Sequence, residues 1–179
     1  MTKAKESRLQ VTAGAALFYP LLLFLDADGW LAALLPAVIC HELGHLLAVW
    51  ACGGRLRSVN VQVFGLCMDI TPFASRGEEL LCTAAGPAAG LLWAAAAYHL
   101  PWSWGVRCSA ASLVINLFNL LPAEPLDGGT MLYALTGSAG LLRVCSWCTA
   151  ALLCAAAVRY RVWGALVPAA LIVKNAVSP

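Results

Sequence analysis

Long apolar runs separated by short polar turns dominate this chain. Because about 20 predominantly apolar residues cross a bilayer as a helix, such runs predict membrane-spanning helices. They predict six helices, at residues 9–25, 30–51, 79–99, 106–121, 138–158 and 161–175. The stretch Arg159-Tyr160-Arg161 leaves almost no loop between the last two. The pattern therefore predicts an all-α polytopic membrane protein.

The polar and apolar positions change period between the second and third predicted helices. Residues 58–63 alternate polar and apolar side chains, and residues 66–71 resume that alternation after Phe64 and Gly65. A period of two is typical of a strand, so this stretch predicts a short β-hairpin. A bare sheet edge cannot face lipid, so the hairpin must pack on protein or face water. The alternative is a loop whose alternation is accidental.

Composition and charge agree with a membrane protein. Of the 179 residues, 61% are hydrophobic and 11% are charged, whereas soluble domains average about 25% charged residues. The net charge of +2, with no basic run, gives no indication of nucleic-acid binding. We expect one intramembrane domain over residues 1–179, with no additional soluble domain. The eight cysteines lie mostly in or beside apolar runs, where free cysteine acts as a small hydrophobic residue.

The distribution of basic residues predicts that both termini lie in the cytoplasm. With that orientation, eight of the eleven basic residues fall on or near the inner side of the membrane, as the positive-inside rule requires. These eight are Lys3, Lys5, Arg8, Arg55, Arg57, Arg76, Arg143 and Lys174. The first apolar run resembles a signal peptide, but Asp26, Ala27 and Asp28 follow it instead of a small-residue cleavage site. We interpret it as an uncleaved first span.

The second predicted helix carries the sequence His41-Glu42-Leu43-Gly44-His45. At about 100° per residue, His45 lies about 40° around the helix from His41, and Glu42 lies about 100° from it. Two imidazoles in one sector can bind zinc, with Glu42 as the general base beside the metal. Chance produces such a pentapeptide in soluble helices, but an ionisable group inside a membrane helix is costly and usually functional. Gly44 points elsewhere and would let a neighbouring helix approach closely.

A catalytic zinc site needs a third protein ligand. The strongest acidic candidate is Asp127, which follows the fourth predicted helix at the depth of His45. Pro122 and Pro125 would end that helix, and the glycines at positions 128 and 129 would permit a sharp turn that aims Asp127 at the metal. The alternative is a solvated aspartate in a turn. The other acidic candidates are Asp26, Asp28, Asp69, Glu78, Glu79 and Glu124.

A polar stripe follows one face of the fourth predicted helix. Ser112, Asn116 and Asn119 are spaced i, i+4 and i+7 along an otherwise apolar segment. We expect Ser112 and Asn116 to make interhelical hydrogen bonds, which is the usual role of such residues in membrane helices. Asn119 lies nearest the Asp127 turn and could donate to a developing oxyanion.

The HELGH pentapeptide and the later stretch NxxPxxPLDGG, at residues 119–129, together resemble the site-2 protease family of intramembrane zinc metalloproteases. The likeness is closest to the small sporulation-type (stage IV) branch, whose members process membrane-tethered transcription-factor precursors. It covers residues 31–130 directly, and Gly86-Pro87 resembles a third landmark of the family.

Residue by residue, the resemblance implies a set of site residues. His41, His45 and Asp127 match the family's ligands of one Zn²⁺ ion. Glu42 matches its general base, and Asn119 matches its substrate-binding residue. The chain also departs from the family pattern. Gly90 stands where relatives often have asparagine, and Thr130 stands where a basic residue often follows the two glycines. These departures concern the positioning of the substrate and not the metal.

The motifs and the resemblance predict an intramembrane zinc endopeptidase. Its expected partners are the lipid bilayer, a membrane-bound regulator and a membrane-embedded protein substrate, such as a transcription-factor precursor or an anti-sigma-type protein. Two alternatives stay open: a zinc-handling membrane transporter, although the chain shows no inverted repeat, and a protease-like membrane protein that binds without cleaving. The intact Glu42 argues against the second. We expect one hairpin strand to pair with the unwound substrate, because an open strand edge offers main-chain hydrogen bonds.

Overall fold

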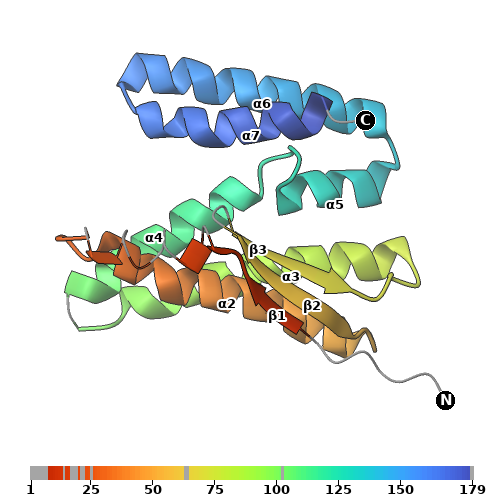
Figure 1. Ribbon diagram of the computed structural model, residues 1–179, viewed down its shortest axis with the longest axis horizontal. Helices are drawn as coiled ribbons and strands as arrows, with labels where there is room; N and C mark the ends of the chain where they lie inside the picture. Colours follow the sequence, from red (N-terminus) through yellow and green to blue (C-terminus); the bar gives the residue numbers. More distant parts are fainter. Residues whose placement is uncertain are drawn as a thin grey trace.

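A computed structural model describes residues 8–13, 15–16, 20, 23–24, 26–62, 65–101 and 103–177 of the chain. Its helices are α2 (Trp30–Ala51), α3 (Arg76–Tyr98), α4 (Ser103–Asn119), α5 (Asp127–Thr136), α6 (Ala139–Tyr160) and α7 (Leu166–Val177), with a 3-10 turn η1 (Trp163–Ala165) before α7. Its strands are β1 (Arg8–Val11), β2 (Leu56–Gln62) and β3 (Gly65–Ile70). Figure 1 labels the helices and strands.

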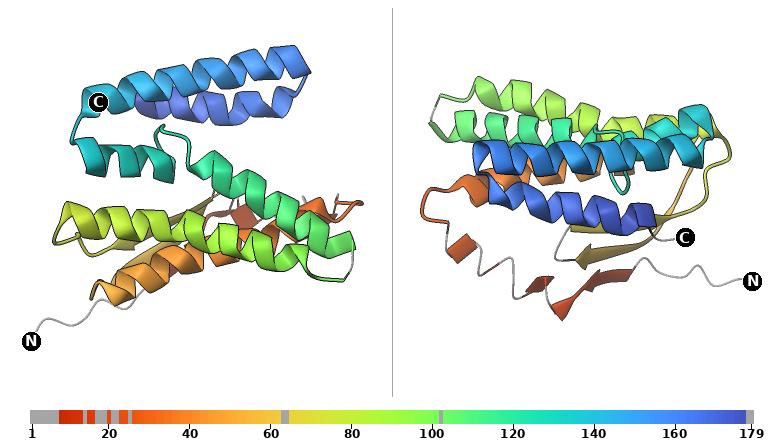
Figure 2. Two further views of the ribbon diagram at one scale, coloured as in Figure 1. Left: turned by 180° about the vertical axis from the view of Figure 1, so that it is seen from behind. Right: turned by 90° about the horizontal axis from the view of Figure 1, so that it is seen from above.

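The helices form two groups that α5 joins (Figures 1 and 2). Helices α2, α3 and α4 pack against one another, and the sheet lies beside them. Helices α6 and α7 form an antiparallel pair, and α5 contacts both α3 and α6. Ala150 of α6 and Ile172 of α7 form a buried apolar cluster with Ala123, which lies between α4 and α5.

Apolar residues cover the outside of the first group, as a lipid environment requires. Within the described residues, three helices are long and apolar enough to cross a membrane, namely α2, α3 and α6. On α2, the exposed side chains of Leu35, Ile39, Leu43 and Leu47 form a stripe at intervals of four residues. Such a stripe faces lipid in a membrane-spanning helix, whereas in water it would favour aggregation.

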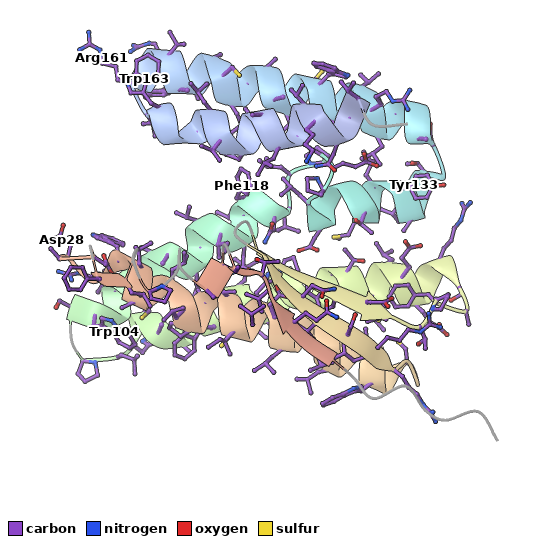
Figure 3. All side chains as sticks on the ribbon, viewed as in Figure 1. Asp28, Trp104, Phe118, Tyr133, Arg161 and Trp163 are labelled. Atoms are coloured by element: carbon purple, nitrogen blue, oxygen red, sulfur yellow. The ribbon has the colours of Figure 1, made fainter. Side chains whose placement is uncertain are left out.

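Helices α4 and α5 follow one another along the length of the molecule, with a break between them. Helix α4 starts at the end of the molecule that carries Trp104 and stops midway, and α5 continues toward the end that carries Tyr133 (Figure 3). Residues 120–126 connect the two helices. Pro122 and Pro125 lie in this connection, where they prevent the helix from continuing because proline lacks an amide hydrogen. The break places the first residue of α5 well inside the molecule.

Three predicted outer connections lie at one end of the molecule. The labelled residues Asp28, Trp104 and Arg161 are all found there (Figure 3). They precede α2, begin α4 and follow α6, as the predicted order of crossings requires. Which of the two ends faces the cytoplasm stays a prediction.

The predicted β-hairpin is present, and a third strand extends it. Strands β2 and β3 are antiparallel, with Val59 opposite Met68. Strand β1 pairs in parallel with the other edge of β2, from Arg8 opposite Ser58 to Val11 opposite Val61. The sheet order is therefore β1-β2-β3, and β2 is the central strand.

The prediction of a first helix over residues 9–25 is wrong at its start. Residues 9–11 belong to β1 and pair with β2. The sequence from Leu9 to Thr12 alternates apolar and polar residues, so it suits a strand as well as it suits the start of an apolar run. Half of the remaining predicted span, residues 12–25, lies outside the described residues.

Two other predicted boundaries also differ from the structure. Helix α5 was not predicted, because Gly128 and Gly129 near its start are poor helix formers. The last helix begins at Leu166 and not at residue 161, because Arg161 has a left-handed backbone with φ of 56° and η1 follows it. The other predicted helices lie within a few residues of α2, α3, α4 and α6.

Candidate metal centre

Helix α2 presents the two histidines of the pentapeptide as neighbours. The rings of His41 and His45 lie edge to face, with centroids 4.7 Å apart and an interplanar angle of 83°. Their Nε2 atoms are 3.1 Å apart. His41 is buried and His45 is half-buried, so both rings face the helical group and not lipid. The spacing of one helical turn therefore brings the two nitrogens to one point, as predicted.

Asp127 reaches the same point from the start of α5. Its Oδ2 lies 3.2 Å from Nε2 of His41, and its Oδ1 lies 3.5 Å from Nε2 of His45. Gly128 and Gly129 have no positive φ, so they do not form the predicted sharp turn. Instead they save space, because a Cβ at Gly128 would overlap the carbonyl oxygen of Leu120 and one at Gly129 would lie 2.6 Å from that of Ala123. The start of α5 can therefore pack directly on the preceding connection.

The separations among these three residues fit a zinc ion. A tetrahedral ion with bonds of about 2.0–2.1 Å holds its ligand atoms about 3.3–3.4 Å apart. The Nε2 atoms of His41 and His45 are 3.1 Å apart, and each lies near a different oxygen of Asp127, at 3.2 Å from Oδ2 and 3.5 Å from Oδ1 respectively. Among the described residues, His41, His45 and Asp127 are also the group of ligand side chains whose donor atoms converge, all within 4.8 Å of one another.

Hydrogen bonds on the far side of each ring fix which nitrogen faces the cluster. Nδ1 of His45 lies 2.8 Å from the carbonyl oxygen of Cys82, which can only accept, so Nδ1 donates. Nδ1 of His41 lies 2.7 Å from Oδ1 of Asn116. In neutral imidazoles both Nε2 atoms then carry lone pairs.

The atoms that face the centre of the cluster are therefore electron-pair donors, and with neutral imidazoles no N–H group is available to form hydrogen bonds between them. Oδ2 of Asp127 is buried and has no hydrogen-bond partner among the described residues. Two imidazole lone pairs and a carboxylate that face one point repel one another unless a cation lies between them. These observations show that the residues fit a bound metal ion with two nitrogen ligands and one oxygen ligand, the donor set of several catalytic zinc sites.

Helix α3 leaves room for the histidines. A Cβ at Gly44 would overlap the carbonyl oxygen of Ala85 and lie 2.7 Å from Cβ of Ala89, so α2 and α3 are in backbone contact there, as predicted. A Cβ at Gly86 would overlap the ring of His45. The Gly86-Pro87 pair thus has a direct structural role, because residue 86 forms one wall of the His45 site.

Glu42 and Asn119 lie differently with respect to the cluster. Glu42 is half-buried and close enough to interact electrostatically with His41, His45 and Asp127. Asn119 is the last residue of α4 and is half-buried. Among the described residues, the Asn119 side chain has no hydrogen-bond partner. The structure thus brings Glu42 to the cluster and leaves the role of Asn119 as a prediction.

The remaining acidic candidates lie elsewhere. Glu124 is exposed, although it precedes Asp127 by only three residues, and Asp69 is an exposed residue of β3. Asp26 accepts hydrogen bonds from the amides of Trp30 and Ala32 and so stabilises the start of α2. Glu78 accepts a hydrogen bond from the amide of Ala74 at the start of α3.

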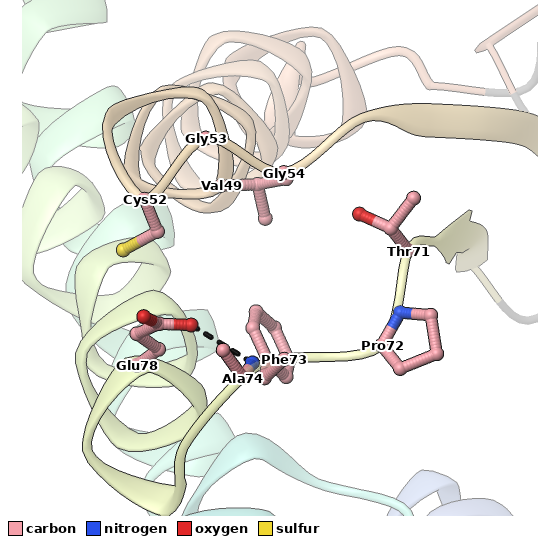
Figure 4. A pocket seen from close by; sticks show the side chains of 9 residues that line it. All are labelled: Val49, Cys52, Gly53, Gly54, Thr71, Pro72, Phe73, Ala74 and Glu78. Carbon is pink, nitrogen blue, oxygen red and sulfur yellow. Dashed lines mark hydrogen bonds between the residues drawn. The ribbon is translucent and has the colours of Figure 1, made fainter.

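A pocket lies at the C-terminal end of α2, and it does not include the cluster. It has a volume of about 170 Å³ and lies between the last turn of α2 and the connection from β3 to α3 (Figure 4). None of the three metal-binding candidates lines it. The lining residues are Val49, Cys52, Gly53, Gly54, Thr71, Pro72, Phe73, Ala74 and Glu78.

Sequence reasoning missed the role of one residue at the cluster. Asn116 contacts His41 directly, whereas the polar stripe on α4 predicted only an interhelical hydrogen bond for it. The stripe was the correct signal, but it did not identify the partner. That partner depends on the rotation of α4 against α2, which a single sequence does not contain.

Comparison with known proteins gives a consistent picture. No protein-family model matches the chain. The chain is 32% identical over 130 residues to Rip3 of Mycobacterium tuberculosis, which is provisionally named a zinc metalloprotease; the match covers 65% of this chain and 33% of Rip3. It is also 32% identical over 116 residues to a protein of Synechocystis with the same provisional name, covering 58% of this chain and 31% of that protein. The chain thus spans about a third of the length of these relatives.

The fold is also found in a solved structure. The site-2 protease from Methanocaldococcus jannaschii matches with a TM-score of 0.73 and 18% identity, over 98% of this chain and 92% of that one. The chain therefore has the fold of that site-2 protease.

Proposed function

We propose that the chain is an intramembrane zinc metalloprotease of the site-2 protease family. The observation that carries the proposal is the convergence of His41, His45 and Asp127 at one point between apolar helices, with Glu42 beside them. Three protein ligands leave a fourth position of a tetrahedral ion open, which distinguishes a catalytic zinc site from a structural one. The provisional names of the relatives and the shared fold support the same function.

The residues at the site suit peptide-bond hydrolysis. One zinc ion held by His41, His45 and Asp127 would polarise the scissile carbonyl and make water more acidic. Glu42 takes a proton from the attacking water and later passes it to the leaving amine. The cluster lies about 9 Å from the end of α2, since His45 precedes Ala51 by six residues at about 1.5 Å each. Hydrolysis therefore takes place below the membrane surface.

The depth of the site supports a membrane-embedded protein as the substrate. A transcription-factor precursor or an anti-sigma-type protein with one membrane-spanning helix fits this description, and the sporulation-type branch is the part of the family we propose. The positive-inside distribution supports cytoplasmic termini. We propose six membrane-crossing segments. They are the predicted first span, α2, α3, α4 together with α5, α6 and α7.

The order of the strands favours one of the two hairpin strands for contact with the substrate. Strand β2 is paired on both sides between Ser58 and Val61, so its edges are not free there. The outer edge of β3 has no strand partner among the described residues. We therefore propose β3 as the strand that pairs with the extended substrate, since an open edge can bind any main chain.

The test of the proposal uses Glu42→Gln, with Glu124→Gln as the matched control. Glu42→Gln should keep the full content of zinc and lose cleavage of a tagged single-span substrate, because the amide cannot accept the proton. Glu124 is exposed, so Glu124→Gln should cleave normally. Cleavage by purified Glu42→Gln at the rate of the unaltered chain would contradict the role of Glu42 in the mechanism. Absence of any cleavage by the unaltered, zinc-loaded chain would favour a zinc transporter or a non-cleaving binding protein.

A further inference from the structure

We infer that Asn116 is a positioning residue for the metal centre, which orients His41 from a different helix. This inference rests on the proposed zinc site. Histidine ligands of metals generally donate their other ring nitrogen to an acceptor that holds the ring in place, and loss of that acceptor typically costs 10–100-fold in metal affinity. In this chain the acceptor for His41 is the Asn116 side chain, with Nδ1 to Oδ1 at 2.7 Å.

The direction of the Asn116 amide follows from its other contacts. Its Nδ2 donates to the carbonyl oxygen of Ser112 at 2.7 Å and to Oγ of Ser112 at 3.2 Å. A carbonyl oxygen only accepts, so the nitrogen of the amide must face Ser112 and the oxygen must face His41. Oγ of Ser112 in turn donates to the carbonyl oxygen of Gly90 at 2.7 Å. A chain of hydrogen bonds thus runs from α3 through α4 to the ring on α2.

This network is complete and closed to solvent. Both Asn116 and Ser112 are 0% exposed, so water cannot replace a contact that is lost. Each hydrogen of the Asn116 amide has an acceptor, and its oxygen has a donor. A buried network in which each member is satisfied holds its groups in one arrangement, and loss of one member leaves another without a partner.

Gly90 provides the space for the amide. A Cβ at position 90 would overlap Cγ, Oδ1 and Nδ2 of Asn116. The glycine that departs from the family pattern is therefore explained by the neighbouring helix, because the Asn116 amide fills the space beside it.

The two histidines are held in different ways. His45 donates to a main-chain carbonyl, that of Cys82, which no substitution removes. His41 donates to a side chain, which a substitution can remove. A change at Asn116 should therefore loosen one ligand of the metal and leave the other two in place.

The experiment measures the zinc affinity of the purified full-length chain in detergent by competition with a chromophoric chelator. Asn116→Leu keeps a similar volume but removes the acceptor, and should weaken zinc binding about 10–100-fold. Asn116→Asp keeps an oxygen that accepts from His41 and should recover at least about tenfold of that loss. The matched control is Asn175→Leu, because Asn175 also donates to the carbonyl four residues earlier but lies on α7. It should leave zinc affinity unchanged.

The Asp variant separates positioning from packing. If Asn116 only packed α4 against α2, Asn116→Asp would be at least as harmful as Asn116→Leu, because a buried carboxylate would face the Ser112 carbonyl. The visible spectrum of the cobalt-loaded chain gives a second measurement, which should change in Asn116→Leu and return toward the original in Asn116→Asp. If Asn116→Leu does not fold, Asn116→Ala replaces it as the variant without an acceptor for His41. In that case the zinc affinity of Asn116→Asp, but not that of Asn116→Ala, should stay within about tenfold of that of the unaltered chain.

Wild-type zinc affinity in a folded Asn116→Leu chain, or no recovery in Asn116→Asp, overturns the inference and leaves the proposed protease in place. Failure of the unaltered chain to bind zinc would remove both proposals.

Discussion

Substitution of Gly86 by alanine tests whether α3 sets the position of a metal ligand. A new Cβ at Gly86 would lie 2.6 Å from Cδ2 of His45 and closer still to Cε1 and Nε2. Ordinary contact begins at 3.4 Å, so the ring must move by at least about 0.8 Å. Zinc ligand distances tolerate changes of about 0.2 Å. We therefore expect Gly86→Ala to displace Nε2 of His45 from the metal.

The ring has little freedom to accommodate that methyl group. Its Nδ1 is held by the carbonyl of Cys82, which lies one turn before Gly86 on the same helix. A shift of the ring therefore breaks the bond to zinc, the bond to Cys82, or both. Because loss of an outer hydrogen-bond partner already costs about 10–100-fold, loss of a ligand should weaken zinc binding by more than about 100-fold.

The measurement is zinc affinity by chelator competition, together with thermal unfolding of the purified chain. Gly77→Ala is the control, since it lies on the same helix and its Cβ would meet only Oγ of Ser75, at 3.8 Å. Helical glycine-to-alanine changes without a clash stabilise by about 0.4–1 kcal/mol, so this control should keep its zinc and its stability. Normal zinc affinity in a folded Gly86→Ala chain would show that α3 does not set the position of His45.

Three further results follow from the same site and sheet. Asp127→Asn should weaken both zinc binding and cleavage, while Glu124→Gln changes neither; the reverse pattern in metal analysis would exchange their roles. Chelation of zinc should lower the free energy of unfolding, by about 2.7 kcal/mol relative to zinc at 100 times its Kd, and an unchanged melting temperature would argue against a bound metal. Met68→Pro and Asp69→Pro together cover both directions in which the amides of β3 can point, toward β2 or toward the open edge. One of the two variants should keep its fold and its zinc but lose cleavage. Normal cleavage by both folded variants would exclude β3 as the docking strand.

The sequence was most informative where one residue type or period determines the local structure. The long apolar runs predicted α2, α3 and α6, because the bilayer leaves a long polar-free segment little alternative to a helix. The alternation at residues 58–71 predicted the β2–β3 hairpin for the same kind of reason, since a period of two fits a strand and not a helix. The pentapeptide placed His41 and His45 in one sector, and helical geometry alone brings them together.

Features that depend on packing between distant segments were not predictable in the same way. The β1 strand forms because β2 offers it an edge, which lies almost 50 residues away in the chain. Helix α5 forms in spite of two glycines because those glycines allow it to pack on Leu120 and Ala123. The contact between Asn116 and His41 depends on how α4 is rotated against α2. Local propensity carries no information about any of these three contacts.

The position of Asp127 after the break between α4 and α5 also has a consequence for when the proposed metal centre can form during synthesis. Helix α2 enters the membrane with His41, Glu42 and His45, but Asp127 and the half-helix that carries it come much later in the chain. At about 5–20 residues per second, the roughly 80 residues between His45 and Asp127 take roughly 4–16 s to synthesise. Throughout that interval a ligand is missing. If the proposed function is correct, a nascent chain would therefore be inactive toward other newly inserted membrane proteins until its own helices have assembled.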